Sequence, residues 1–429
     1  MKAPVISLTP RAVNRVRFAA ILGVLGPGLV SGFADNDAGG ISTYSVAGAK
    51  FGYDLLWVLL ASQIVLFFTQ EVGARLGLAT GQGLAGLVRE RYGVRWATFL
   101  ICTMLVANIG SIIAEFAGVG AALSLFNVPD WIAALLAATV VILLLTRGSY
   151  GKVQYLFVAV GLGVSIAYFI SALLAHPNWG LAASSLVIPR LSTSAAYWVA
   201  VVATVGTTIT PWGQAFIQSY VADKRLGPED LVGERLDVGL GALLTNLIAG
   251  FIVVACAAAV FSTGHQIDTN SADAVKDIAG ALTPLAGSGA TVLFAIGLLA
   301  ASFLGLGVVP LTSAYAACEA FGWETGVDWR WREAPAFYGL MIFFVVFSAL
   351  FVLAVPRASL VQLMLTAQMV NAILLPFVLV FVMRLSADKK LMGPLVSGRW
   401  LLGIGWIGTG LLVVLSLTLV ATSVFGIGS

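Results

Sequence analysis

Charged side chains are scarce in this chain. Only 10% of its 429 residues are Asp, Glu, Lys or Arg, whereas 59% are hydrophobic and the mean hydropathy is +0.99. A soluble domain carries roughly a quarter charged residues, so a chain this poor in charge could not cover a water-facing surface. The composition therefore excludes an ordinary soluble protein and predicts a chain that is solvated mostly by lipid.

Histidine, cysteine and catalytic motifs are scarce as well. The two histidines, His176 and His265, fall in predicted loops, and the three cysteines lie in apolar runs without metal-ligand or disulfide spacing. The sequence contains no HExxH, GxSxG or GxxxxGK[ST] motif, so nothing in it indicates an enzyme or a bound cofactor. The basic residues are scattered in short loops, which argues against nucleic acid as a partner.

Long hydrophobic runs are abundant, and a membrane span needs about 20 apolar residues. The runs predict eleven transmembrane helices in a multi-pass protein of the cell (inner or plasma) membrane, with lipid as its surroundings. The predicted spans are 18–48, 53–78, 96–126, 129–146, 153–175, 195–221, 237–263, 285–320, 335–355, 358–384 and 399–425.

The positions of Lys and Arg predict the orientation of these spans. If the N-terminus is cytoplasmic, nineteen of the 23 basic residues lie on the inner side, and only Lys50, Arg190, Lys276 and Arg357 lie outside. Because cytoplasmic loops are enriched in Lys and Arg, we expect the N-terminus inside and the C-terminus outside. The expected parts are a cytoplasmic segment (1–17), a five-helix repeat (18–176), an extracellular loop (177–194), a second, inverted five-helix repeat (195–384), a cytoplasmic loop (385–398) and an eleventh helix with an extracellular tail (399–429).

Two of the spans contain residues that interrupt a helix. In the first span, Asp35-Asn36-Asp37-Ala38 is followed by paired glycines, although charged groups at this depth cost roughly 2.5–3.5 kcal/mol each. The stretch could be a loop between two short helices, but neither half is long enough to span the membrane. Asp37 could also serve as the N-cap of the second half-helix.

The sixth span reads Thr210-Pro211-Trp212-Gly213-Gln214 at the equivalent place, and this pattern fits either a proline kink or a true break. Spans one and six each begin a set of five helices, and an odd number of spans inverts the second set. Interrupted helices at corresponding positions of two inverted halves indicate a substrate site at the midplane of the membrane. We therefore predict an all-α LeuT-type 5+5 inverted repeat with discontinuous helices one and six, working by alternating access. The two helices should be unwound near 35–40 and 210–213.

Several stretches resemble the NRAMP family of metal transporters. They are QEVGARLG (70–77), the segment 80–92, AEFAG (114–118), LFAIGLLA (293–300), Gln368 with Pro376-Phe377 eight residues later, and DKKLMG (388–393). The resemblance runs in order from about Gly26 to Gly393. It implies a LeuT-type fold with eleven or twelve helices, and uptake of divalent transition metals, usually with protons.

The motifs at the two breaks depart from the family pattern. The family's Asp-Pro-Gly-Asn is Asp35-Asn36-Asp37-Ala38 here, so the liganding aspartate is kept, the liganding asparagine becomes Ala38, and a second carboxylate appears. The family's Met-Pro-His is replaced by Thr210-Pro211-Trp212. These differences resemble the NRAMP-related magnesium transporters.

The chemistry of the expected ligands also favours Mg²⁺. A thioether favours soft metals, whereas carboxylates, carbonyls and water suit Mg²⁺, Ca²⁺ and Mn²⁺. The loss of the methionine and the gain of Asp37 therefore predict Mg²⁺, with Mn²⁺ tolerated. The short Ala38 leaves room for a retained water. The expected metal ligands are Asp35, Asp37, Ala34, Thr210, Gly213 and Gln368, and the expected pocket and path residues are Ala38, Trp212, Gln214 and Glu115.

Some alternatives stay open at this point. Glu115 could line the ion path or be hydrogen-bonded in the core, and Gln368 could make an interhelical hydrogen bond instead of binding an ion. The histidine that the family has in its sixth helix is absent, and Ile112 replaces the family's aspartate three residues before Glu115. The span 335–355 contains no charged residue. We therefore expect transport without proton coupling. The alternatives are a proton-coupled Mn²⁺/Fe²⁺ transporter and an amino-acid or amine symporter of the same fold.

Overall fold

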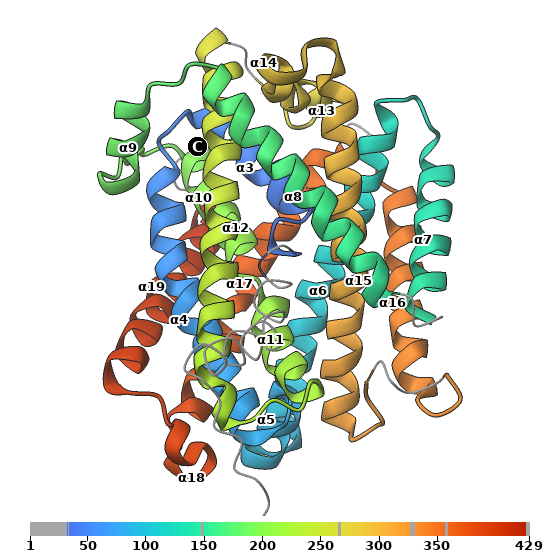
Figure 1. The fold of residues 1–429 in the computed structure, drawn as a ribbon, viewed down its shortest axis with the longest axis vertical. Helices are drawn as coiled ribbons and strands as arrows, with labels where there is room; N and C mark the ends of the chain where they lie inside the picture. The colour runs from blue at the N-terminus through green and yellow to red at the C-terminus, as the bar shows by residue number, and fades with distance from the viewer. Residues whose placement is uncertain are drawn as a thin grey trace, which may run out of the picture.

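The computed structural model describes residues 32, 34–146, 150–264, 267–326, 331–356 and 359–425. The described residues form helices joined by turns and contain no strand (Figure 1). The segment 1–17, most of the first half of span 18–48, and His265 lie outside the described residues. The expectations for these parts stay predictions.

Seven helices in the described part of the chain are long and apolar enough to cross a membrane. They include α4 (Leu56–Thr80), α6 (Val94–Ser124), α12 (Leu231–Ala259), α15 (Ala290–Phe321), α16 (Pro335–Leu353), α17 (Leu360–Ser386) and α19 (Arg399–Phe425). Other helices occupy the remaining predicted spans: α3 (Ala38–Phe51), α7 (Asp130–Thr146), α8 (Tyr150–Leu174), α10 (Ala195–Thr208) and α11 (Pro211–Asp223). Each predicted span thus has helix at its position. The count of eleven stays a prediction, because most of the first half of span one is not described.

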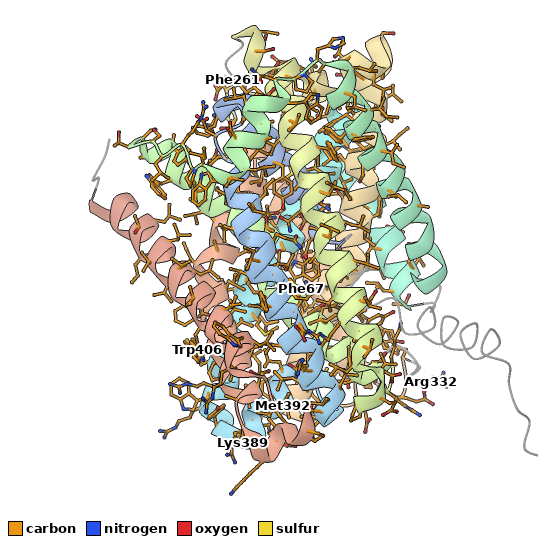
Figure 2. All side chains as sticks on the ribbon, turned by 60° about the vertical axis from the view of Figure 1, so that its left-hand side comes forward. Phe67, Phe261, Arg332, Lys389, Met392 and Trp406 are labelled. Atoms are coloured by element: carbon orange, nitrogen blue, oxygen red, sulfur yellow. The ribbon has the colours of Figure 1, made fainter. Side chains whose placement is uncertain are left out.

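Short helices mark the two ends of the bundle. Figure 1 shows α5 (Leu84–Tyr92) and α18 (Lys389–Met392) at one end, and α13 (Ala274–Ala279) and α14 (Thr283–Ala286) at the other. Figure 2 likewise places Lys389 and Arg332 at the end opposite Phe261. Which of these ends is cytoplasmic stays a prediction from the positions of Lys and Arg. The predicted outer loop 177–194 is not entirely irregular, because it contains the helix α9 (Trp179–Val187).

The half-helix α3 lies at the centre of the bundle, packed against α6, α10, α12 and α17. Small residues allow these close approaches, as is common between membrane helices. A Cβ atom on Gly118 of α6 would overlap the side chain of Ala38, and one on Gly206 of α10 would overlap the carbonyl oxygen of Gln368. In contrast, α19 runs along the outside of the bundle, where Trp406 is exposed (Figure 2). The helices that carry the predicted site are therefore closely packed.

Candidate metal site

The first break is shorter than the sequence suggests. The chain is helical at Asp35, bends at Asn36 and Asp37, and resumes as α3 at Ala38. Asp37 is the N-cap of α3, and its Oδ1 accepts a hydrogen bond of 2.6 Å from the amide of Gly40. The predicted break over residues 35–40 was therefore too wide, because the side chain of Asp37 satisfies an otherwise free amide and restarts the helix early.

The second break begins one residue earlier than predicted. The helix α10 ends at Thr208, and Thr210 is extended, with φ −88° and ψ 143°. Thr210 caps α11, because its Oγ1 accepts from the amide of Gly213 at 3.1 Å. Pro211 occupies the first helical position, where its missing N–H costs nothing. A true break rather than a kink separates α10 from α11.

The cap formed by Thr210 makes Gly213 less suitable as a metal ligand than the sequence predicted. Its amide serves the cap, and the residue lies inside the first turn of α11 rather than in the break. A carbonyl within a helix accepts from the amide four residues later. The carbonyls without such a partner are those of the last turn of α10, residues 206–209. These are better placed as ligands than the Gly213 carbonyl.

The two breaks are in direct contact. The hydroxyl of Thr210 donates to Asp35 Oδ1 at 3.0 Å, so one side chain caps α11 and also holds a carboxyl group of the opposite break. One turn into α3, Tyr44 Oη lies 2.9 Å from Thr208 Oγ1 at the end of α10. These hydrogen bonds confirm that the breaks face each other.

The two aspartates are buried, and each leaves one oxygen without a hydrogen bond. Asp35 is 0% exposed and Asp37 is 1% exposed, and Oδ2 of each has no hydrogen-bond partner among the described residues. Neither carboxyl group takes part in an ion pair within the described part of the chain. Because burying an uncompensated carboxylate is costly, this arrangement suits a site that receives a cation.

Glu115 reaches the same place from α6. Its Oε2 accepts from the amide of Ala38 at 3.3 Å, and its carboxyl group adjoins that of Asp37. Gly305 of α15 makes room for it, since a Cβ atom there would lie 2.6 Å from the Glu115 carboxyl carbon. Glu115 is thus both hydrogen-bonded in the core and a neighbour of the first break.

Gln368 of α17 lies against the start of α3. A Cβ atom on Gly39 would overlap Gln368 Nε2 and would lie 3.3 Å from Asp37 Oδ1. The other end of the amide, Oε1, accepts from Asn371 Nδ2 at 2.9 Å. The structure therefore brings Gln368 to the break, but with its nitrogen toward Gly39.

The remaining predicted residues are buried around the breaks. Ala34 lies one residue before Asp35, and Gln214 lies in the first turns of α11 with neither amide atom hydrogen-bonded within the described chain. Trp212 is fully buried with its ring 6.5 Å from that of Phe216, as expected for a wall. Ala38 packs on Gly118 of α6. A neighbouring helix therefore lies directly against the methyl group of Ala38. The retained water expected beside Ala38 stays a prediction.

Three polar residues of this region were missed from the sequence. Thr207 Oγ1 lies beside Gly40, where a Cβ atom would be 3.2 Å away, and Asn371 and Ser111 hydrogen-bond to each other behind Gln368. A signal existed for Asn371, because it follows Gln368 by three residues on an otherwise apolar helix and so shares its face. The described residues contain no group of three His, Cys, Asp or Glu side chains that could hold a metal. An ion here would need carbonyl, amide or hydroxyl ligands as well.

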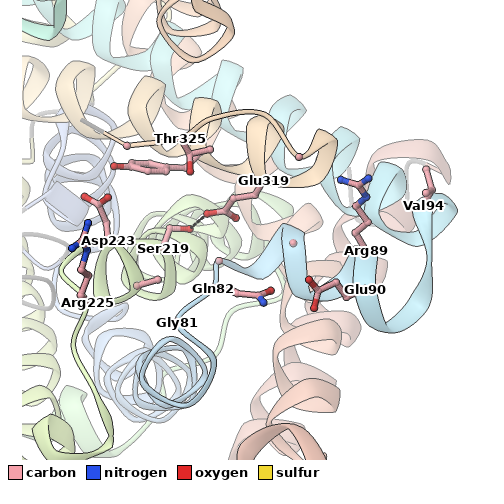
Figure 3. Close-up of a pocket in the computed structure, with 16 residues that line it drawn as sticks. Gly81, Gln82, Arg89, Glu90, Val94, Ser219, Asp223, Arg225, Glu319 and Thr325 are labelled. Atoms are coloured by element: carbon pink, nitrogen blue, oxygen red, sulfur yellow. Dashed lines mark hydrogen bonds between the residues drawn. The ribbon is translucent and has the colours of Figure 1, made fainter. Parts of the chain in front are cut away.

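A cavity of about 940 Å³ lies at the α5 end of the bundle (Figure 3). Its lining includes Gln82, Asp223 and Glu319, and Ser219 of α11 donates to Glu319 Oε1 at 2.9 Å. Neither Asp35 nor Asp37 lines this cavity.

Comparison with known proteins identifies the family. A family model described as natural resistance-associated macrophage protein-like (Nramp) matches residues 28–422. This chain is a member of the Nramp family. The match confirms the resemblance drawn from the sequence.

Curated relatives cover nearly the whole Nramp chain. The divalent metal cation transporter MntH of Mesorhizobium japonicum is 28% identical, over 96% of this chain and 91% of the relative. The MntH protein of Xylella fastidiosa is 30% identical, over 93% of this chain and 85% of the relative. These relatives are named as transporters and not as enzymes. The chain is accordingly a multi-pass membrane protein of a transporter family.

Solved structures share the fold of this Nramp protein. The manganese transporter of Eremococcus coleocola matches with a TM-score of 0.77 at 20% identity, covering 100% of this chain and 91% of that one. MhsT, solved in complex with L-phenylalanine, matches with a TM-score of 0.59 at 15% identity, covering 90% and 98%. These likenesses, together with the paired breaks, confirm the all-α LeuT-type fold.

Proposed function

We propose that this Nramp protein transports a divalent metal cation, which is held between the two breaks during alternating access. One observation carries the proposal: Asp35 and Asp37 are buried at the first break, each with an unpaired oxygen, opposite the neutral cap at Thr210. A cation would supply the missing positive charge. The names of the curated relatives, divalent metal cation transporters, support the same class of substrate.

We infer that Mg²⁺ is the preferred ion and that Mn²⁺ is also carried. The side chains available at the breaks offer oxygen: two carboxyl groups, the hydroxyl of Thr210 and the amide of Gln368, with the carbonyls that end α10. Mg²⁺ is bound by oxygen ligands and often keeps several waters. At the second break the hydroxyl of Thr210 stands where the family has a thioether, the soft ligand that would favour Fe²⁺ or Cd²⁺.

One observation favours the alternative, a Mn²⁺/Fe²⁺ transporter. Met364 lies one turn before Gln368 on α17, is buried, and accepts a hydrogen bond from Ser42 of α3 through its sulfur at 3.3 Å. A thioether so close to the first break could serve a softer metal if it exchanged Ser42 for the ion. An amino-acid symporter has less support, because two carboxyl groups at the first break would repel the carboxylate of such a substrate.

We also propose that transport is not coupled to protons. On α6, the residues between Arg95 and Glu115 include no charged side chain, and α16 carries none either. The polar groups next to Glu115 on the α5 side are neutral: Ser111 bonds to Asn371, and Asn108 donates to Ser313 at 2.9 Å. A proton relay needs titratable groups along its path. The contact of Glu115 with Asp37 is the place where coupling would arise if this proposal is wrong.

Uptake into proteoliposomes tests the proposed function. We expect Mg²⁺ to compete with Mn²⁺ uptake at comparable concentrations, and Ca²⁺ to compete less well. A pH-sensitive dye trapped in the lumen should report no metal-dependent acidification. Inert Mg²⁺ together with strong competition by Cd²⁺ or Fe²⁺, or acidification during Mn²⁺ influx, would support the proton-coupled alternative. Absence of any metal uptake would refute the proposal.

A further inference from the structure

The amide of Gln368 is held from behind by a second amide. Asn371, one turn further along α17, donates from Nδ2 to Gln368 Oε1 at 2.9 Å and to Ser111 Oγ at 3.0 Å. Ser111 Oγ also lies 3.4 Å from Asn371 Oδ1. All three side chains are 0% exposed. The orientation of the Gln368 amide is therefore set by partners that do not face the break.

In this arrangement the nitrogen of the Gln368 amide, and not its oxygen, faces the proposed cation site. Gln368 Nε2, which can only donate, has no hydrogen-bond partner within the described chain and lies beside Gly39, next to Asp37. An arriving cation would instead require the acceptor, Oε1, which Asn371 occupies.

We propose that Asn371 is a positioning residue for ion binding, and that the amides of Gln368 and Asn371 turn over together when a divalent cation enters the site. The two ends of an amide have nearly the same shape, so a half-turn needs no extra space. After the turn, Gln368 Oε1 faces the break and Nε2 donates to Asn371 Oδ1.

Ser111 makes both arrangements possible. Its hydroxyl can accept from Asn371 Nδ2 before the turn and donate to Asn371 Oδ1 after it, since a hydroxyl does both. The buried amides thus keep hydrogen bonds in either state, which matters because an unsatisfied buried polar group is costly. The side chains of Gln368, Asn371 and Ser111 can therefore adopt two hydrogen-bonded arrangements, and no charged group takes part in the change between them.

This inference rests on the proposed ion site and deepens it, and a double-mutant cycle tests it in proteoliposomes with Mn²⁺ as the probe. We expect Gln368→Ala to raise the KM for Mn²⁺ by about tenfold, the effect of one lost charge-assisted ligand. Asn371→Leu should raise the KM by about three- to tenfold with kcat changed less than about twofold, and the double variant should resemble Gln368→Ala alone, because coupled residues are not additive. A merely structural role for Asn371 would lower kcat or folded yield instead.

The chain offers a matched control pair. Asn246 of α12 donates from Nδ2 to Gln63 Oε1 of α4 at 2.7 Å, which is the same amide-to-amide contact away from the breaks. Asn246→Leu should not change the KM for Mn²⁺, and its effects should multiply with those of Gln368→Ala. If Asn371→Leu does not fold, Ser111→Ala should give a smaller KM increase that is again absent in the Gln368→Ala background.

Two outcomes would overturn the proposal: an unchanged KM in Asn371→Leu, or KM changes that multiply in the double variant. Uptake by Asp35→Ala distinguishes failure of the amide turn from failure of the proposed ion site. If Asp35→Ala abolishes Mn²⁺ uptake while Gln368→Ala has no effect, the ion site stands and the amide turn is refuted. If Asp35→Ala transports normally, the site itself is misassigned.

Discussion

The first break carries two carboxyl groups, whereas the second carries none. At the first break, Asp35 and Asp37 are buried with unpaired oxygens. At the second, Thr210 caps α11 and Pro211 fills the first helical position. The same interruption of a helix is thus built from charge in one half of the molecule and from neutral capping in the other.

This difference separates two requirements of an ion site. Charge at the first break gives the affinity for a cation, while the cap at the second keeps its helix ends and carbonyls in place. The two meet in the hydrogen bond from Thr210 to Asp35. Variants at the first break should therefore change ion binding without unfolding the protein, and variants at the second should act mainly through geometry and stability.

The largest effect is expected at Asp35. Asp35→Ala should reduce Mn²⁺ and Mg²⁺ uptake to background and leave the protein folded, because removing a buried carboxyl group that has no cationic partner among the described residues relieves a desolvation cost. Uptake by proteoliposomes and the elution profile in detergent measure the two effects. Wild-type uptake by this variant would contradict the assignment of cation affinity to the first break.

Asp37 sharpens the comparison, because it is both a carboxyl group and a cap. Asp37→Ala removes the charge and also a cap worth about 1 kcal/mol, whereas Asp37→Asn removes only the charge. We expect both variants to lose most metal uptake, and only Asp37→Ala to lower the melting temperature as well. Equal melting temperatures would show that the cap of α3 contributes little.

At the second break, the most disruptive change should be Gly206→Ala. The added methyl group would overlap the backbone carbonyl of Gln368 and crowd Ala372, so α10 and α17 must separate, at a cost of about 1–3 kcal/mol. We expect lower folded yield and weak transport. Gly250→Ala on α12 is the control, because nothing lies within 4 Å of a Cβ atom there. Equal yields for the two variants would mean that the close approach at Gly206 is easily relaxed.

A smaller effect is expected at Thr210. Thr210→Ala removes the cap of α11 and the hydrogen bond to Asp35, and should lower stability by about 1 kcal/mol and raise the KM for Mn²⁺ several-fold. Thr210→Ser keeps the hydroxyl and should behave like the unchanged protein. Thermal unfolding and uptake kinetics test this pair. If serine fails to rescue the alanine defect, the methyl group rather than the hydroxyl is what matters.

The smallest effect is expected at Glu115, if transport is uncoupled from protons. Glu115→Gln keeps an acceptor for the Ala38 amide, so Mn²⁺ uptake should fall only a few-fold, and its dependence on external pH should not change. Uptake measured at several pH values decides the matter. A lost pH dependence in the variant would show that the pair of Glu115 and Asp37 exchanges protons.

Much of this architecture follows from the chain alone. Apolar runs of membrane-spanning length locate the helices, and carboxyl groups with glycines in the first span and Thr-Pro in the sixth locate the breaks. These signals are local, since each depends on the cost of placing a residue type in lipid or in a helix. They located the breaks within a few residues and identified Asp35 and Asp37 at the first one, whereas Gln368 was identified through the resemblance to the family.

The tertiary structure decided what each of these residues touches. Capping by Asp37 and Thr210 set where α3 and α11 begin, and this moved Gly213 out of the second break. Packing of α6 and α17 on α3 brought Glu115 to Asp37, placed Gly118 against Ala38, and turned the nitrogen of Gln368 toward Gly39. The sequence determined which residues must avoid lipid. Their partners depend on contacts between helices far apart in the chain, and only the folded bundle sets those.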